Sequence, residues 1–327
     1  MMPRGLKPAV LAVAGVASLL LWLDVGSRGA VTTALVCGAL VCALPRTVDF
    51  LEGRPRLTAL ARHGILCLFC AIAVLPVVRV LSISLRPGDR LLSTSLAIIP
   101  EGANLDAYVR LFTDEPFLVW MRNSLLVSLV ATIIGVVFAS TAGYAFSRYR
   151  FPGRKVGLLA VLTTQMFPAT MLLLPLFVLL ARLHLVNTLL GLGVIYVSTA
   201  LPFSIWLMKG YYDTIPASLE EAALIDGLDR WGAFRLVVLP IAAPALVITA
   251  LFSFMNAWTD YMVAAQIMQD EALFTLPVGL KTFQSNMGTE WGLYAAAALL
   301  VSGPVVALFL YLNRWLVSGM ALGSVKE

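Results

Sequence analysis

The sequence of 327 residues is dominated by long apolar segments with short polar stretches between them. A helix needs about 20 apolar residues to cross the hydrocarbon of a bilayer. Eight segments approach or exceed that length, although the first two are short and contain Gly and Thr. They span residues 8–23, 29–45, 64–85, 119–146, 157–181, 188–208, 241–266 and 292–312. The sequence therefore predicts an all-α integral membrane protein with eight spans.

Composition supports this class. Hydrophobic residues make up 60% of the chain and charged residues only 13%, against about 25% charged residues in a typical soluble domain. The net charge of +5 does not indicate a nucleic-acid partner, because in a membrane protein the location of Lys and Arg matters more than their sum.

The first apolar segment follows Arg4 and Lys7, an arrangement that is also typical of a secretory signal peptide. No convincing A-x-A cleavage site follows it, and the second apolar segment begins almost at once. We therefore favour an uncleaved hairpin with its cytoplasmic linker at residues 1–62, ahead of a membrane domain at residues 63–327. A cleaved first segment remains the alternative.

The distribution of positive charge predicts the orientation. If the chain crosses eight times from a cytoplasmic N-terminus, the majority of its 23 Lys and Arg residues fall on the cytoplasmic side. The compact cluster RYRFPGRK at 148–155 contributes most, and such a bias is typical of cytoplasmic loops. We therefore expect both termini and the polar loop at about 209–240 to be cytoplasmic.

That loop contains a short polar helix. Ser218 and Glu221 have the spacing of a capping box, and Gly227 is suited to a left-handed stop, which together predict a helix over 219–226. Leu219, Ala222 and Ala223 share one face, where small side chains permit close approach by another surface.

Two interpretations of this helix are open. An interfacial helix would lie on the lipid headgroups and carry flanking basic residues. This helix instead carries Glu220, Glu221 and Asp226, which are poorly suited to an anionic membrane surface. The charges favour docking to another protein.

A longer pattern runs through the same loop and resembles the E-A-A-x-x-x-G-x9-I-x-L-P motif of permease subunits of binding-protein-dependent ABC importers. The matching residues are Glu221, Ala222, Ala223, Gly227, Val237 in the isoleucine position, Leu239 and Pro240. Further stretches are similar to the maltose/maltodextrin branch of that family: ISLRPGDR (83–90), GYAFSRYRFPGRK (143–155), QMFPA (165–169) and RWLVSGMALGSVK (314–326). The resemblance covers roughly residues 64–327 and implies a six-span core, so the N-terminal hairpin is an addition.

The resemblance implies a role for each part of the chain. The loop helix would be the coupling helix that docks on a cytoplasmic ATPase, and the C-terminal tail would reach between two ATPase subunits. The implied coupling residues are Glu220, Glu221, Ala222, Ala223, Asp226, Gly227, Leu239 and Pro240, and the implied tail residues are Gly319, Gly323 and Lys326. The outer loop near 275–287 would enter a binding protein.

The implied assembly is an oligosaccharide importer, for maltose or maltodextrin, in a bacterial or archaeal cytoplasmic membrane. Its other members would be a homologous second permease, two cytoplasmic ATPase subunits and an extracytoplasmic sugar-binding protein. The chain itself would also contact membrane lipid. Another di- or oligosaccharide, such as trehalose or a galactoside, is the first alternative.

The chain has no phosphate-binding G-x-x-x-x-G-K-[ST] and no G-x-S-x-G motif, so we expect no enzyme activity, no catalytic residue and no cofactor, with ATP hydrolysed by the partner. No metal site is expected either. His63 and His184 stand near span ends, and Cys67 and Cys70 lack a second pair of ligands.

Asn256, Trp258 and Asp260 are candidates for the substrate path. A carboxylate within a span is costly and normally faces water or a partner, while amide, carboxylate and aromatic ring together suit a sugar. The alternative places Asp260 at the outer interface, with Trp258 in the aromatic belt. A stand-alone secondary transporter or channel would show paired intramembrane charges and inverted repeats, but only Asp260 and Arg79 are candidates for such charges.

Overall fold

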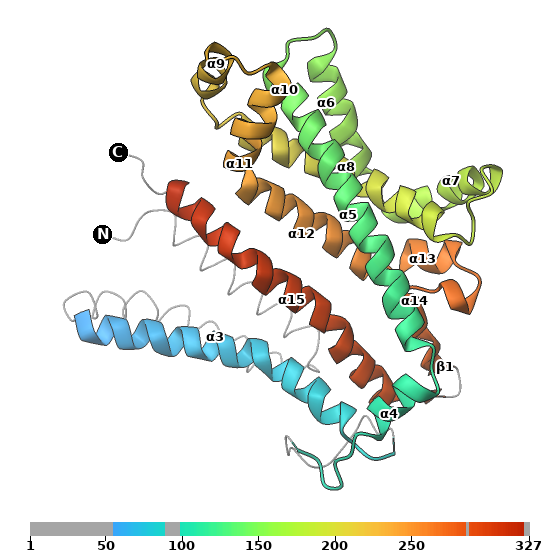
Figure 1. Cartoon of the computed structure of the whole chain (residues 1–327). Helices are drawn as coiled ribbons and strands as arrows, with labels where there is room; N and C mark the ends of the chain where they lie inside the picture. The colour runs from blue at the N-terminus through green and yellow to red at the C-terminus, as the bar shows by residue number, and fades with distance from the viewer. Residues whose placement is uncertain (1–54, 89–98, 286–287, 324–327) are drawn as a thin grey trace, which may run out of the picture. The chain divides into compact units, whose positions relative to one another are not determined.

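The computed structural model describes residues 55–88, 99–285 and 288–323 (Figure 1). The chain divides between Val77 and Val78 into two compact units, and the second unit carries the sites discussed below. The predicted spans 8–23 and 29–45 lie outside the described residues. The N-terminal hairpin, the total of eight spans and the domain boundary after residue 62 therefore remain predictions.

The described chain is almost entirely helical. Its α-helices are α3 (Pro55–Ser84), α4 (Asp106–Thr113), α5 (Phe117–Arg148), α6 (Arg154–Thr163), α7 (Ala169–Arg182), α8 (Leu189–Tyr212), α9 (Ala217–Ile225), α10 (Arg230–Ala233), α11 (Leu239–Ile241), α12 (Ala243–Thr259), α13 (Met262–Ile267), α14 (Leu276–Thr282) and α15 (Trp291–Gly323). Shorter turns are η1 (Thr164–Met166), the π-helix η2 (Phe234–Val238) and η3 (Glu271–Leu273). Strands β1 (Gln284–Ser285) and β2 (Gly288–Thr289) pair antiparallel, with Gln284 opposite Thr289.

Within the described residues, four helices are long and apolar enough to cross a membrane. They are His63–Ser84, Phe117–Arg148, Leu189–Tyr212 and Trp291–Trp315, and they agree with the predicted spans 64–85, 119–146, 188–208 and 292–312. Two further spans arise only if each of two sharply bent helix pairs counts as one crossing. The predicted spans 157–181 and 241–266 therefore correspond to these bent helix pairs.

Local chemistry explains both breaks. The first pair bends by 107° at Phe167 and Pro168, which both have extended backbone with ψ near 130°. Proline pushes its predecessor out of the helical region, so helix ends there. The second pair bends by 78° between α11 and α12. The α12 helix also ends at Thr259, and extended Asp260 separates it from α13.

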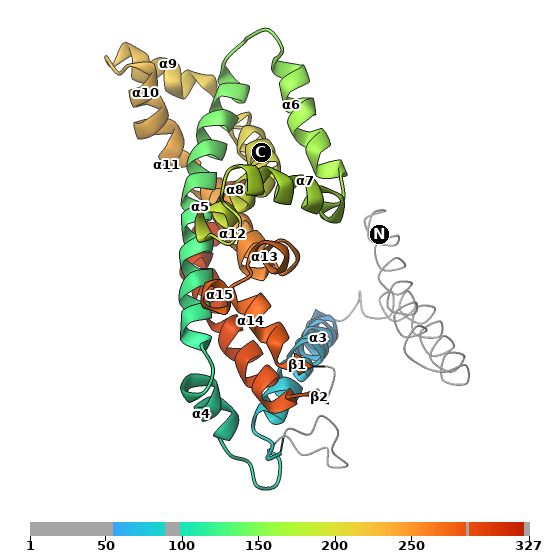
Figure 2. The same cartoon turned by 90° about the vertical axis from the view of Figure 1, so that its right-hand side faces the viewer.

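The second unit is built around α5, α8 and α12, which pack against one another along their length (Figure 2). Small buried residues recur on α5 every four positions, at Ala131, Gly135, Ala139 and Gly143. Such stripes let helix backbones approach closely in a membrane. The approach is tightest at Gly143, where an added Cβ would lie 2.8 Å from the Cβ of Met208 on α8.

Aromatic and aliphatic clusters close the two ends of this bundle. At one end Tyr144, Tyr212, Phe234 and Val238 pack together beneath the polar loop. At the other, Trp120 and Trp258 lie in a cluster to which α15 and α14 contribute. The bundle therefore offers a rigid support at each end for the loops that it carries.

Candidate coupling surface

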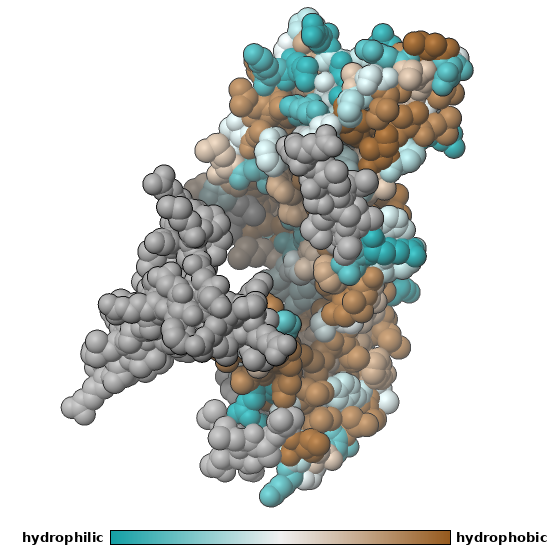
Figure 3. Space-filling model, turned by 90° about the vertical axis from the view of Figure 1, so that its left-hand side faces the viewer, coloured by the Kyte–Doolittle hydropathy of each residue, from teal (hydrophilic) through white to brown (hydrophobic). Residues whose placement is uncertain are grey.

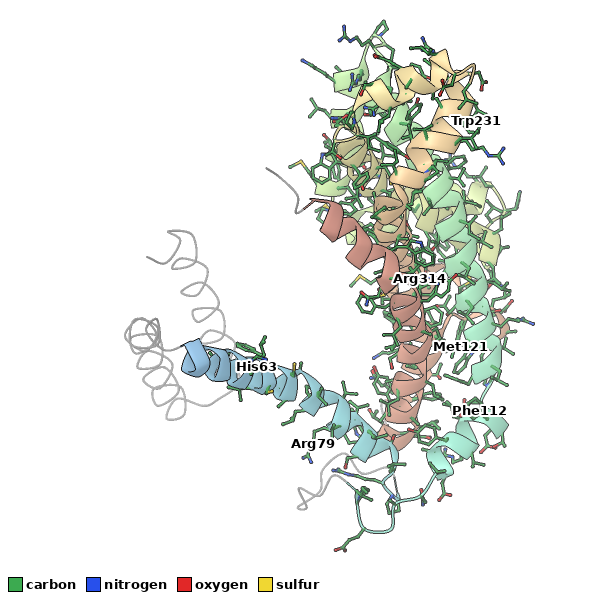
Figure 4. All side chains as sticks on the ribbon, turned by 60° about the vertical axis from the view of Figure 1, so that its left-hand side comes forward. His63, Arg79, Phe112, Met121, Trp231 and Arg314 are labelled. Atoms are coloured by element: carbon green, nitrogen blue, oxygen red, sulfur yellow. The ribbon has the colours of Figure 1, made fainter. Side chains whose placement is uncertain are left out.

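The polar loop forms a projection at one end of the second unit. Figures 1 and 2 show α9, α10 and α11 together beside the end of α5. Figure 3 shows hydrophilic residues gathered at this end of the molecule and apolar residues predominating farther along. In Figure 4 the label Trp231 marks α10 at this end, whereas Phe112 and Met121 lie toward the opposite one.

The loop helix exists, but its start differs from the prediction. The helix begins at Ala217, one turn of chain after α8, with Pro216 as its N-cap and no side-chain capping bond. The predicted capping box is therefore wrong, because Ser218 already lies within the helix. Pro216, with φ −59° and ψ 131°, brings the chain directly into the first turn without needing a hydroxyl cap.

The C-terminal stop is confirmed. Gly227 has a φ of +93°, which L-residues with a Cβ adopt rarely. Its N–H bonds the carbonyl of Leu224, and the N–H of Leu228 bonds the carbonyl of Ala223. This pair of bonds is a Schellman motif, and it fixes the angle at which the chain leaves α9.

Glu220 attaches the loop helix to the long span α5. Its two carboxylate oxygens accept hydrogen bonds from the Tyr144 hydroxyl at 2.7 Å and the Arg148 Nε at 2.5 Å. The Glu220 and Arg148 side chains are only 12% and 15% exposed. Arg148 also donates to the carbonyl of Ile215, at the turn before α9. The sequence pattern placed Glu220 among the ATPase-facing residues, yet the structure turns it toward its own bundle.

A second ion pair extends this attachment to α8. Lys209 and Asp213 lie one turn apart at the end of α8 and bond at 2.5 Å, while Ser147 of α5 donates to the other oxygen of Asp213 at 2.7 Å. Burial opposes ionisation of Asp213, but the hydrogen bonds from Lys209 and Ser147 outweigh it and hold the pKa of this carboxyl below its usual range. Side-chain hydrogen bonds therefore link the ends of α5 and α8 and the turn into α9.

The other predicted coupling residues of α9 and its C-terminal end differ in exposure. Ala223 is buried against the bundle, whereas Glu221, Ala222, Asp226 and Gly227 are exposed. Leu219 is also exposed, so the predicted face of Leu219, Ala222 and Ala223 is shared between solvent and core. Sequence reasoning missed Ile225, which is 86% exposed and is the most prominent apolar side chain of the helix. Its place in the last turn, two residues before a glycine stop, was the available signal.

The chain returns to the membrane through an unusual turn. Residues Phe234–Val238 form a π-helix, in which the N–H of Leu239 bonds the carbonyl of Phe234. Pro240 has no N–H to offer the carbonyl four residues before it, which favours the wider turn. A pocket of about 540 Å³ lies between α5 and this turn, lined by residues that include Thr141, Tyr144, Tyr149 and Trp231.

The structure describes part of the predicted C-terminal tail and part of the predicted outer loop. Gly319 and Gly323 belong to the last turns of α15, and Lys326 lies outside the described residues. At the opposite end, α5 holds the segment before α14: Trp120 and Asn123 donate to the carbonyls of Glu271 and Ala272, and Ser124 accepts from the N–H of Leu276. The predicted loop near 275–287 thus begins as helix α14 and leads into β1.

The candidate substrate residues do not form the predicted group. Trp258 is 2% exposed and stacks on Phe254, so it cannot offer a ring face to a sugar, and that prediction was wrong. Asp260 accepts from the Tyr196 hydroxyl at 3.0 Å and from the N–H of Ala264 at 3.1 Å. It therefore joins α8 to the start of α13. Asn256 alone is exposed.

The described residues contain no cluster of three or more His, Cys, Asp or Glu side chains that could hold a metal ion. Cys67 and Cys70 are free thiols.

Comparison with known proteins decides the family. The profile of the binding-protein-dependent transport system inner membrane component matches residues 131–322. The maltose/maltodextrin transport system permease protein MalG of Escherichia coli K12 is 37% identical over 282 residues, which cover 81% of this chain and 94% of that protein. The chain belongs to this family.

Other members of this permease family agree. MalG of Yersinia pestis is 36% identical, and the match covers 83% of this chain and 94% of that protein. The inner membrane ABC transporter permease protein YcjP of E. coli K12 is 34% identical, and the match covers 82% of this chain and 97% of that protein. A chain of the crystal structure of a bacterial ABC transporter involved in the import of the acidic polysaccharide alginate superposes with a TM-score of 0.68 at 23% identity, over 79% of this chain and 96% of that one. That likeness confirms the permease fold. The chain is thus a multi-pass inner-membrane transport component rather than an enzyme.

Proposed function

We propose that this permease forms half of the translocation pathway of an ATP-driven importer for maltose or maltodextrin. The identity of 37% to MalG over most of both chains is the observation that carries this proposal. In the assembly a second, homologous permease supplies the other half of the pathway, two ATPase subunits bind below, and an extracytoplasmic protein delivers the sugar.

The coupling role rests on the exposed face of α9. Ile225, Leu219 and Ala222 present apolar surface beside the acidic Glu221, on a helix fixed at both ends. An exposed apolar patch with charged neighbours is typical of a protein-binding surface. Through Glu220 and Arg148, a push on this face reaches α5 without relying on loop backbone.

The orientation is supported by charge. The α5 helix ends at Arg148 in the basic turn, and α15 carries Arg314 next to the rings of Tyr311 and Trp315, at 4.6 and 3.9 Å from their centroids. Arg and aromatic residues at a span end are typical of a membrane interface, and an excess of basic residues favours the cytoplasmic one. We infer that α9 and both termini lie in the cytoplasm.

Reconstitution tests the proposal. The permease would be purified with its second permease and ATPase, placed in proteoliposomes, and supplied with the binding protein loaded with maltose, maltotriose, trehalose or a galactoside. We expect ATP-dependent uptake of maltose and maltotriose, and no uptake without ATP. Uptake restricted to trehalose or the galactoside would reassign the sugar, and uptake without any ATPase would replace the importer by a secondary transporter.

A further inference from the structure

Three uncharged polar side chains from separate elements meet among the membrane-spanning helices. Gln165 of η1 donates from Nε2 to the backbone carbonyl of Thr199 on α8 at 2.9 Å. The hydroxyl of Thr199 lies 3.4 Å from Oδ1 of Asn256 on α12 and 3.2 Å from the carbonyl of Tyr196 on its own helix, so its one hydrogen is shared between these two acceptors. Gln165 and Asn256 are exposed and Thr199 is half-buried, so the group opens away from the core of its own chain.

The depth of this group makes its exposure significant. Thr199 lies near the middle of the span Leu189–Tyr212. Polar side chains at that depth are costly in lipid and usually face water or another protein. Gln165 stands at the break between α6 and α7, and irregular backbone within a membrane is tolerated only where protein buries it or water fills a cavity beside it. Two independent features thus indicate that this side does not face lipid.

Aromatic rings of α8 and α12 lie next to this polar group, and we call the polar group and these rings together the seam. One helical turn from Thr199 and Asn256, the rings of Phe203 and Phe252 meet at a centroid distance of 4.3 Å. The ring centroid of Trp206 lies 6.3 Å from that of Phe203, and the Trp206 side chain is 48% exposed. Pro202 also leaves the carbonyl of Ser198 without its usual N–H donor. Hydroxyl, amide and carbonyl groups beside aromatic faces suit a sugar, whose hydroxyls form hydrogen bonds and whose polarised C–H groups pack on rings.

We propose that Gln165, Thr199 and Asn256, with Phe203 and Phe252, form the sugar-contacting step of this subunit's half of the pathway. The inference rests on the proposed function and names the residues that carry it out. Its ligand class is a neutral oligosaccharide, because the five side chains are uncharged and Asp260, one turn beyond Asn256, is already bonded to Tyr196. The group would pass the sugar along by weak, exchangeable contacts.

Cysteine accessibility tests the location without depending on the sugar. Thr199→Cys and Asn256→Cys would be introduced singly into a complex whose four native cysteines are replaced by serine, and labelled with a membrane-impermeant methanethiosulfonate reagent. Val130→Cys is the control, because Val130 is 50% exposed in the apolar groove between α5 and α8. We expect labelling at 199 and 256 in at least one nucleotide state, and none at 130. Absence of labelling at 199 and 256 in every state would overturn the proposal.

Transport kinetics test the contact itself. In proteoliposomes, Thr199→Val with Asn256→Leu is expected to lower sugar uptake about 5- to 30-fold, the loss expected for one or two neutral hydrogen bonds. ATP hydrolysis stimulated by loaded binding protein should change less than twofold, because the coupling surface is intact. Ser302→Ala on α15 serves as a polar control and should transport normally.

The outcomes separate this inference from the proposed function. Labelling at 199 and 256 that maltotriose protects, together with reduced uptake, supports both. Labelling with protection only by a different neutral sugar supports the site and reassigns the substrate. Normal uptake by the double variant, or loss of the second permease from the purified complex, would overturn the inference and mark the seam as a subunit interface.

Discussion

Glu220 illustrates how one residue can differ from its sequence neighbour in role. Glu220→Ala removes the partner of Arg148 from a largely buried site, where hydrogen bonds to charged groups are worth about 1.5–3 kcal/mol each. We expect α9 to loosen, so that sugar-stimulated ATPase activity and uptake fall together about tenfold or more. The exchanged pair Glu220→Arg with Arg148→Glu should recover part of the activity. If the loss of activity in the exchanged pair equalled the sum of the losses in the two single variants, the interaction between Glu220 and Arg148 would not contribute to activity.

Glu221 is exposed and makes no side-chain hydrogen bond or ion pair with the described residues, so we expect its substitution to act through the ATPase. Glu221→Lys reverses the charge on the docking face. We expect normal membrane insertion and permease yield but loss of ATP-dependent uptake, measured as uptake per copy of assembled permease. Normal uptake at normal yield would contradict the coupling assignment.

Asp260 was a candidate sugar ligand, but in the structure its carboxylate links α8 to α13 by hydrogen bonds. Asp260→Ala removes the acceptor for Tyr196 and Ala264, at a cost of about 1–3 kcal/mol, and should lower the yield and heat resistance of the purified permease. Tyr196→Phe should reproduce part of that loss. If Asp260→Ala instead gave full yield with weaker apparent sugar affinity, the original substrate-path prediction would be restored.

Sequence patterns predicted these residues unevenly for a physical reason. The stop at Gly227 was predicted because backbone conformation is encoded locally, whereas Leu239 and Pro240 were placed only by their match to the family motif. The partners of Glu220 and Asp260 lie 72 and 64 positions away, and no local pattern tells which face of a helix meets which neighbour. Trp258 was predicted to contact a sugar because aromatic rings suit sugars, but its ring packs on Phe254 inside the protein.

At the scale of elements, the angle at which the chain leaves α9 depends on Gly227. Gly227→Ala meets no neighbouring atom within 4 Å, so its effect is purely the strain of a positive φ, about 1–2 kcal/mol. We expect uptake to fall several-fold as the last turn of α9, with Ile225, loses its fixed position. Gly210→Ala is the matched control, since Gly210 also has open space but lies within α8, and should be neutral. Equal behaviour of the two variants would contradict the role of the stop.

The helices themselves were easier to predict than their interruptions. Hydropathy over about 20 residues reports how much apolar surface a segment has, and it found all the long helices of the described chain. It is insensitive to the direction of the helix axis, so it did not locate the bends at Phe167–Pro168 and before α12 within the predicted spans. Pro168 was visible, but Pro175, Pro202 and Pro304 lie inside helices that continue, so proline alone does not predict a break.

At the scale of the whole molecule, the segment ahead of the permease core can be tested by deletion. The relatives match 81–83% of this chain while covering 94% or more of their own length, so the core needs little beyond the matched part. A chain that starts near Arg62 should still assemble with its partners and transport sugar, with lower yield. Intact assembly without transport would show that residues 1–62 take part in the mechanism.

The uninterrupted course of α5 has a consequence for timing. Its 32 residues extend about 48 Å and join the loop helix at Arg148 to the segment before α14 at Trp120 and Asn123. No break interrupts α5 between Phe117 and Arg148, and its small residues pack closely on α8. We therefore expect a tilt imposed at one end of α5 to reach its other end directly. Any lag between inner and outer events should then originate in the two bent crossings, at residues 167–168 and 241–243.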